Sequence, residues 1–110
     1  MIKRNDNIRF LLPEKSGLYF LFDKDKNLVY IGRAKNLKIR LLQHYNNYEN
    51  LLRHNELLKE GIKPSWTPQG MQWAKPFEYL RYSLIPDLKK LHNEELKFIH
   101  KLTPILNDTC

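Results

Sequence analysis

The chain has 110 residues and is 42% hydrophobic, which allows one compact core and excludes two ordinary domains, so a single domain over residues 1–110 is expected. It shows neither the apolar run of about eighteen residues that a membrane span needs nor the apolar leader of a secreted protein. Its one cysteine, Cys110, excludes a disulfide framework, so we expect a cytoplasmic protein without membrane contact. The 19 Lys and Arg against 12 Asp and Glu give a net charge of +7, which favours nucleic acid as the partner.

Two apolar segments near the N-terminus predict a β-hairpin. Residues 1–16 contain a short apolar patch that Pro13 stops, and no long element is expected there. Residues 17–22 (GLYFLF) and 28–31 (LVYI) are apolar and aromatic or β-branched, and a polar loop separates them. This pattern is typical of two antiparallel strands joined by a turn.

Tyr19 and Tyr30 lie one in each predicted strand. Tyrosines in strands usually cover a sheet, with their hydroxyls at its edge. Both can point to the same face only if Tyr19 lies opposite Gly32, or at an equivalent even shift, because a slip of one residue reverses every side chain. A turn that pairs Phe22 with Val29 would satisfy this condition.

The spacing of apolar residues becomes helical from Lys35 to about Tyr48. Asn36 is a plausible start signal for this helix. Residues 51–60 predict a second helix, which Gly61 ends. One stripe of the first helix is apolar and consists of Leu37, Leu41, Tyr45 and Tyr48.

Arg40 and His44 are four residues apart and flank this stripe, so both should emerge where the helix meets the sheet. An arginine there suits a clamp on phosphate, and a histidine suits proton transfer. The alternative for His44 is a hydrogen-bonded histidine at the margin of the core.

Residues 61–76 hold three prolines, two glycines and both tryptophans, and they predict a long loop. Trp66 and Trp73 either stack on splayed bases or anchor this loop to the core. The sequence favours neither role.

A strand and a helix follow the loop. Residues 77–85 resume a strand pattern, Pro86 ends it, and Asp87 can cap a helix that runs to Leu102. The predicted order of two strands, a helix, a loop, a strand and a helix indicates an α+β fold with a small antiparallel sheet.

Glu95 lies in the middle of the apolar stripe of this last helix, whereas Glu94 can face water. A carboxylate facing a core costs several kcal/mol unless it is paired, hydrogen-bonded, protonated or bound to a cation. Two interpretations stay open, namely a buried ion pair with a lysine or arginine and a metal ligand at the floor of a cleft. The other members of the stripe are Leu88, Leu91, Phe98, Ile99 and Leu102.

These residues form an ordered set of motifs that resembles the GIY-YIG nucleases over residues 17–107. The ordered combination is far more specific than any one of its parts. The set comprises Gly17-Leu18-Tyr19, ten intervening residues, Tyr30-Ile31-Gly32, the helix sequence RAKNLKIRLLQH, and then Glu95, Phe98, Ile99, Pro104 and Asn107.

The resemblance implies a three-stranded antiparallel sheet flanked by helices and a metal-dependent DNA endonuclease. It implies that Glu95 holds a single Mg²⁺ or Mn²⁺ ion and that Arg40 binds the scissile phosphate. The attacking water would contact Tyr19 and Tyr30, with one tyrosine or His44 as general base. The DNA can be single-stranded, duplex or branched, and the domain is expected to act alone, as a homodimer or with a protein partner. The expected substrate-binding residues are Arg33, Lys35, Asn36 and Asn107.

Three alternative interpretations of the sequence differ from this one. Asp87, Glu95 and Lys97 spell the PD…ExK pattern of another nuclease class, but a helical segment would place Glu95 and Lys97 on different faces. A catalytically silent DNA-binding module of a larger complex would keep the fold and the charge. A purely structural basic protein would leave Glu95 unexplained.

Overall fold

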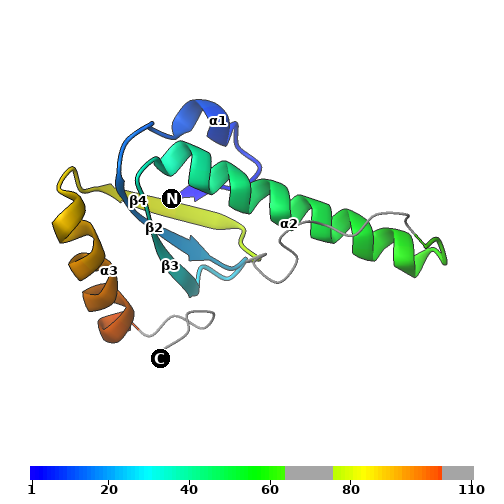
Figure 1. The fold of residues 1–110 in the computed structure, drawn as a ribbon. Coiled ribbons are helices and arrows are strands. Elements are labelled where there is room, and N and C mark those ends of the chain that lie inside the picture. The colour runs from blue at the N-terminus through cyan, green and yellow to red at the C-terminus, as the bar shows by residue number, and fades with distance from the viewer. Residues whose placement is uncertain (64–75, 103–110) are drawn as a thin grey trace.

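The computed structural model describes residues 1–63 and 76–102 (Figure 1). Its four strands form one antiparallel sheet in the order β1-β4-β2-β3. The predicted α+β class with a small antiparallel sheet is confirmed, and the two-residue β1 adds a strand to the three that the resemblance implied. The elements in chain order are β1 (Ile2–Lys3), α1 (Ile8–Leu11), β2 (Gly17–Phe22), β3 (Leu28–Ala34), α2 (Leu37–Lys59), β4 (Tyr79–Leu84) and α3 (Leu88–Leu102).

Helices α2 and α3 pack on opposite faces of the sheet. Neighbouring residues of β2 point to opposite sides, and each helix contacts one of two such neighbours. Tyr19 contacts His44 of α2, with ring centroids 5.2 Å apart. Phe20 packs edge-on against Phe98 of α3 at 5.6 Å. In Figure 1, α2 runs across the sheet and past it, and α3 lies to the left of the strands. The main core lies on the α2 face and includes Leu21, Leu37, Leu41, Phe77 and Leu80.

The register of the β2–β3 hairpin largely follows the prediction. Tyr19 lies opposite Gly32, as expected. The last pair of the ladder joins Phe22 to Leu28, so the predicted pairing of Phe22 with Val29 was wrong. The reason is a β-bulge at the end of β2, which shifts the register just before the turn.

Helix α2 is one continuous helix of 23 residues, so the prediction of separate helices over 35–48 and 51–60 was wrong. No proline or glycine interrupts its backbone before Gly61, which has a φ of 77° and ends the helix as predicted. At the other end, the side chain of Asn36 accepts the backbone N–H of Ile39 at 3.2 Å, which confirms the predicted cap. Figure 1 shows the second half of α2 running past the sheet.

Strand β4 and helix α3 follow the prediction closely. The strand is shorter than the expected 77–85, because Phe77 turns into the core before the ladder begins. The carboxylate of Asp87 accepts the backbone N–H of Lys89 at 2.9 Å, which confirms the predicted cap of α3. The predictions on the loop residues Trp66 and Trp73 and on Pro104 lie outside the described residues.

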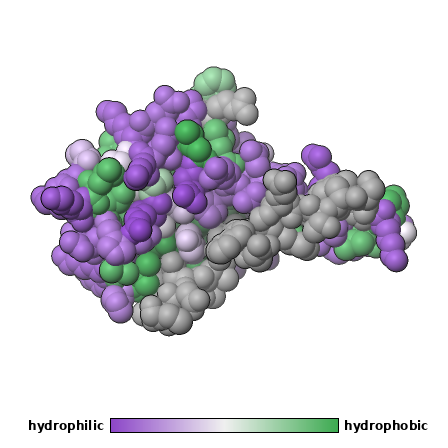
Figure 2. Space-filling view, in the orientation of Figure 1, coloured by the Kyte–Doolittle hydropathy of each residue, from purple (hydrophilic) through white to green (hydrophobic). Residues whose placement is uncertain are grey.

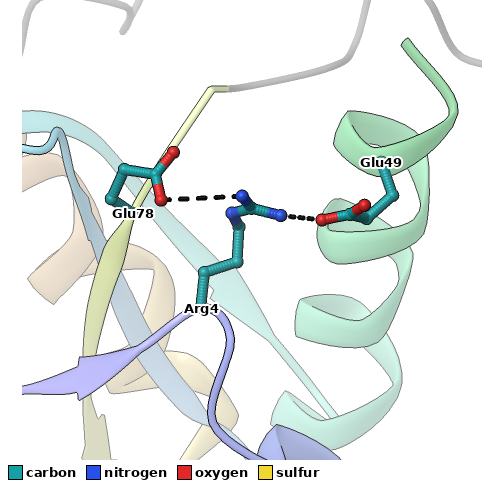
Figure 3. Close-up of polar contacts among 3 residues, drawn as sticks. All are labelled: Arg4, Glu49 and Glu78. Carbon is teal, nitrogen blue, oxygen red and sulfur yellow. Dashed lines mark hydrogen bonds and ion pairs between the residues drawn. The ribbon is translucent and has the colours of Figure 1, made fainter. Parts of the chain in front are cut away.

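Arg4 is a buried cation that joins the N-terminal segment to α2 and to β4, and no sequence pattern indicated this role. Its residue surface is only 7% exposed. The guanidinium forms ion pairs with Glu49 of α2 and, at 3.5 Å, with Glu78 beside β4 (Figure 3). It also lies over the ring of Tyr48 at 4.9 Å from the centroid. Arg4 therefore fixes the middle of α2 against the sheet.

The surface is mainly hydrophilic. In the view of Figure 2, hydrophilic side chains dominate the surface, and the exposed apolar side chains form separate patches. Among residues 1–63 and 76–102, no helix combines the length and the apolar character that crossing a membrane requires.

Candidate active site

Three ring side chains from β2, β3 and α2 meet on the α2 face of the sheet. The Tyr19 hydroxyl lies 2.9 Å from Nε2 of His44, and this hydrogen bond is buried. The ring of Tyr30 lies 6.0 Å from that of Tyr19 and 5.8 Å from that of His44, between centroids. The structure therefore brings together three of the five predicted catalytic residues. It also places His44 at the margin of the core, as its position beside the apolar stripe indicated.

Gly32 leaves the space that Tyr19 fills. A Cβ atom at position 32 would lie 2.2 Å from both Cζ and the hydroxyl oxygen of Tyr19, which no side chain tolerates. The two residues are direct cross-strand partners, so the tyrosine ring lies across the backbone of β3. The glycine of the second motif is therefore required by the position of Tyr19.

The environment of Tyr19 favours its protonated form. Burial raises the pKa of the Tyr19 hydroxyl well above its ordinary value, and the neighbouring Tyr30 and the charge of Glu95 raise it further. The positive charge of Arg40 acts in the opposite direction. The Tyr19 hydroxyl is thus a neutral phenol near pH 7, and it lies within electrostatic reach of both Arg40 and Glu95.

Glu95 is partly shielded and paired, not deep in the core. Its side chain is 17% exposed, and its Oε1 lies 3.5 Å from Nη1 of Arg33. Desolvation raises the pKa of the Glu95 carboxyl, and the charge and backbone N–H of Arg33 partly offset this effect. The expected burial among leucines was wrong in extent, because Leu88 and Leu102 are half-exposed and only the middle of α3 packs on the sheet. Glu94, which was expected to face water, is partly buried.

The residues around Glu95 fit a metal ion that takes a single protein ligand. Within the described parts of the chain, no group of three His, Cys, Asp or Glu side chains could hold a metal ion. This excludes an all-protein cage there, but Mg²⁺ commonly takes one or two carboxylates and completes its shell with water and substrate phosphate. Arg33 is 44% exposed, so its side chain can leave Glu95 without opening the core.

A cleft of about 490 Å³ opens between the start of α2 and the start of α3. Its lining includes four of the predicted site residues, Arg33, Lys35, Asn36 and Arg40. Arg40 is exposed, whereas His44 one turn later is buried. The cleft adjoins the tyrosine cluster through Arg40 and adjoins Glu95 through Arg33. The remaining predicted residue, Asn107, lies outside the described residues.

The helical conformation of residues 88–102 excludes the competing PD…ExK site. Asp87 caps this helix through its carboxylate, and Glu95 and Lys97 are two residues apart on it. That site needs its acidic residues on neighbouring strands, so the match to the pattern is coincidental.

Several residues of the cleft were not predicted from the sequence, namely Ile39, Gln43, Leu88 and His92. Helical periodicity indicates which residues share a face of α2 or of α3. It does not show that the two helices approach each other at their N-terminal turns. No sequence signal pointed to these four residues.

Comparison with known proteins places the chain among GIY-YIG domains. Residues 15–107 match the family described as the GIY-YIG catalytic domain. UvrABC system protein C of Mycoplasma mycoides subsp. mycoides is 46% identical over 41 residues, which are 37% of this chain and 7% of that protein. The protein of the same name from Flavobacterium johnsoniae is 39% identical over 49 residues, 44% of this chain and 8% of that protein. The similarity thus spans a small part of these curated relatives.

Solved structures show the same fold. The N-terminal GIY-YIG endonuclease domain of UvrC from Thermotoga maritima, bound to its catalytic magnesium, superposes with a TM-score of 0.61 at 24% identity and covers 94% of this chain and 99% of that one. A point mutant of that domain gives 0.62 at 21% identity, with 94% and 98% covered. Because the family match extends over residues 15–107, the chain belongs to the GIY-YIG family and matches it over the catalytic domain.

Proposed function

We propose that this single domain hydrolyses a phosphodiester bond of DNA with one divalent metal ion, Mg²⁺ or Mn²⁺, bound by Glu95. The observation that carries the proposal is the 2.9 Å hydrogen bond between Tyr19 and His44, which lies within reach of the charges of Arg40 and Glu95. Buried polar groups joined in this way beside an open cationic cleft are typical of a reaction centre.

Arg40 binds the scissile phosphate from the wall of the cleft. It is exposed, and an arginine offers several N–H donors to phosphate oxygens. It also stabilises the negative charge that develops as the phosphorus is attacked. Arg40→Ala is expected to reduce kcat/KM by about 100-fold or more. A metal ion at Glu95, when bound, neutralises charge on the phosphate and lowers the pKa of a coordinated water molecule.

His44 is the proton acceptor, and Tyr19 connects it to the attacking water. The phenol of Tyr19 is protonated, and it passes this proton to Nε2 of His44 as it takes one from the water. The resulting hydroxide attacks phosphorus, and the leaving oxygen takes a proton from solvent. Tyr30, which lies beside both rings, orients the water.

DNA is the proposed substrate. The net charge of +7 and the cations of the cleft suit a polyanion, and the comparison structures are endonuclease domains by description. A homodimer or a protein partner is the proposed source of the choice of cut site.

A double-mutant cycle tests the proton path. Tyr19→Phe and His44→Ala are each expected to reduce kcat about 100-fold, and the double variant should lose little more than the worse single variant. Tyr45→Phe removes a hydroxyl from the residue next to His44 and should retain wild-type activity. Losses that multiply in the double variant would show that Tyr19 and His44 act independently and would contradict the path.

A further inference from the structure

The cleft between α2 and α3 contains more than a phosphate site requires. Its lining includes two buried apolar residues, Ala34 and Leu91, and two apolar residues that are about half-exposed, Ile39 at 55% and Leu88 at 50%. Single exposed leucines are ordinary on protein surfaces. Two large aliphatic side chains from different helices that line one small cleft are a more specific arrangement.

Polar groups complete this arrangement. Arg33, Lys35 and Arg40 contribute three cations to the lining, and Gln43 and His92 contribute side chains that donate and accept hydrogen bonds. An apolar surface with a few converging polar groups is typical of a small-molecule pocket, and the cations add an affinity for phosphate. Apolar surface, hydrogen-bonding groups and cations in one cleft match the three chemical parts of a nucleotide.

We infer that this cleft receives one nucleotide of the bound strand, adjacent to the phosphate that is cut, with its base between Ile39 and Leu88. The inference rests on the proposed nuclease function. The volume of about 490 Å³ falls within the range of about 300–1,000 Å³ that small-molecule pockets occupy, which leaves room for a single nucleotide.

The position of the cleft supports this occupant. Arg33 lines the cleft and also contacts Glu95, and Arg40 lines the cleft and also acts on the Tyr19 hydroxyl. A nucleotide in the cleft is therefore next in the chain to the phosphate on Arg40. Because its base leaves the stack to enter the cleft, the preferred substrate has an unpaired nucleotide beside the cut, as in a single strand or a flap.

Removal of single bases tests the inference. The cut site in a labelled single-stranded oligonucleotide is mapped first, and the base on each side of it is then removed in turn. For the wild type, base removal on one side should raise KM about tenfold, which matches the loss of one base contact, and should leave kcat nearly unchanged. Leu88→Ala should raise KM for the intact strand, and in this variant removal of the base should raise KM no further.

Leu96→Ala is the matched control, because Leu96 is also an exposed leucine of α3 but does not line the cleft. It should behave as the wild type on every strand. The inference is overturned if KM of the wild type stays unchanged whichever of the two bases is removed. It is also overturned if base removal raises KM by the same factor in Leu88→Ala as in the wild type.

A binding experiment separates failure of this inference from failure of the nuclease proposal. If the wild type cuts nothing, chemical shifts of the ¹⁵N-labelled protein are followed with a tetranucleotide, with the same tetranucleotide without bases, and with inorganic phosphate. Shifts at Ile39, Leu88 and His92 that require the bases support the cleft independently of catalysis. Equal shifts with phosphate alone, or none at all, would overturn it.

Discussion

Oε1 of Glu95 lies 3.5 Å from Nη1 of Arg33, so the carboxylate proposed to bind a metal ion already has a cationic partner. Arg33 and a divalent ion compete for the same oxygen. We therefore expect Arg33→Gln to lower the Mg²⁺ concentration needed for half-maximal cleavage and to raise KM for DNA, because a phosphate contact is lost. A Mg²⁺ titration at two DNA concentrations measures both effects. An unchanged or higher Mg²⁺ requirement would show that Arg33 does not compete.

The Glu95 carboxyl is expected to destabilise the fold near neutral pH. Because its pKa is raised in the folded state, its contribution to stability is present below the ordinary pKa and is lost as the pH rises through the raised value. In urea unfolding at pH 7, Glu95→Gln should therefore have a free energy of unfolding equal to that of the wild type or higher by less than about 1 kcal/mol, because Arg33 is close to half-exposed. The difference in the free energy of unfolding between the two proteins should vanish at about pH 4. A clear loss of stability at pH 7 would mean that the ion pair outweighs desolvation.

Gly32→Ala should displace Tyr19. The added methyl would lie 2.2 Å from the tyrosine hydroxyl, so the ring must move away from His44. Cleavage should fall about as far as in Tyr19→Phe, roughly 100-fold, and Gly32→Ala should have little further effect in a Tyr19→Ala background. Kinetics of the three variants check this. Wild-type activity of Gly32→Ala would show that the position of Tyr19 is not critical.

The parts of the fold that depend on neighbouring residues were predictable. The strand period of two left few registers that place Tyr19 and Tyr30 on one face, and the observed pairing of Tyr19 with Gly32 is one of them. Asn36 and Asp87 cap their helices through backbone groups two or three residues away. Such contacts follow from local chemistry alone.

The features that were missed depend on how elements approach one another. Arg4 pairs with Glu49, 45 residues along the chain, and no local pattern indicates that pair. Periodicity placed Glu95 on the apolar side of α3, but it could not show that only the middle of this helix covers the sheet. The cleft between α2 and α3 likewise depends on how two helices that are distant in the sequence approach each other.

Arg4 is expected to contribute to stability more than any surface cation. Arg4→Ala would remove the partner of Glu49 and Glu78 and the contact with Tyr48. We expect a loss of about 1–3 kcal/mol in the free energy of unfolding, below the cost of a fully buried pair because both carboxylates are partly exposed. Urea unfolding measures it, with Lys3→Ala as the control on exposed Lys3. Equal midpoints for the two variants would contradict this role.

The central claim is metal-dependent cleavage through Glu95, and the most direct test is gel-resolved cleavage of matched single-stranded, duplex and branched DNA. The wild type, Glu95→Ala and the control Glu94→Ala are each assayed with Mg²⁺, with Mn²⁺ and with chelator. We predict that the wild type and Glu94→Ala cut when a metal ion is present, that chelator stops them, and that Glu95→Ala binds DNA but does not cut it. Cutting by Glu95→Ala, or binding without cutting by the wild type on every substrate, would contradict the claim, and the second result would indicate a catalytically silent DNA-binding module.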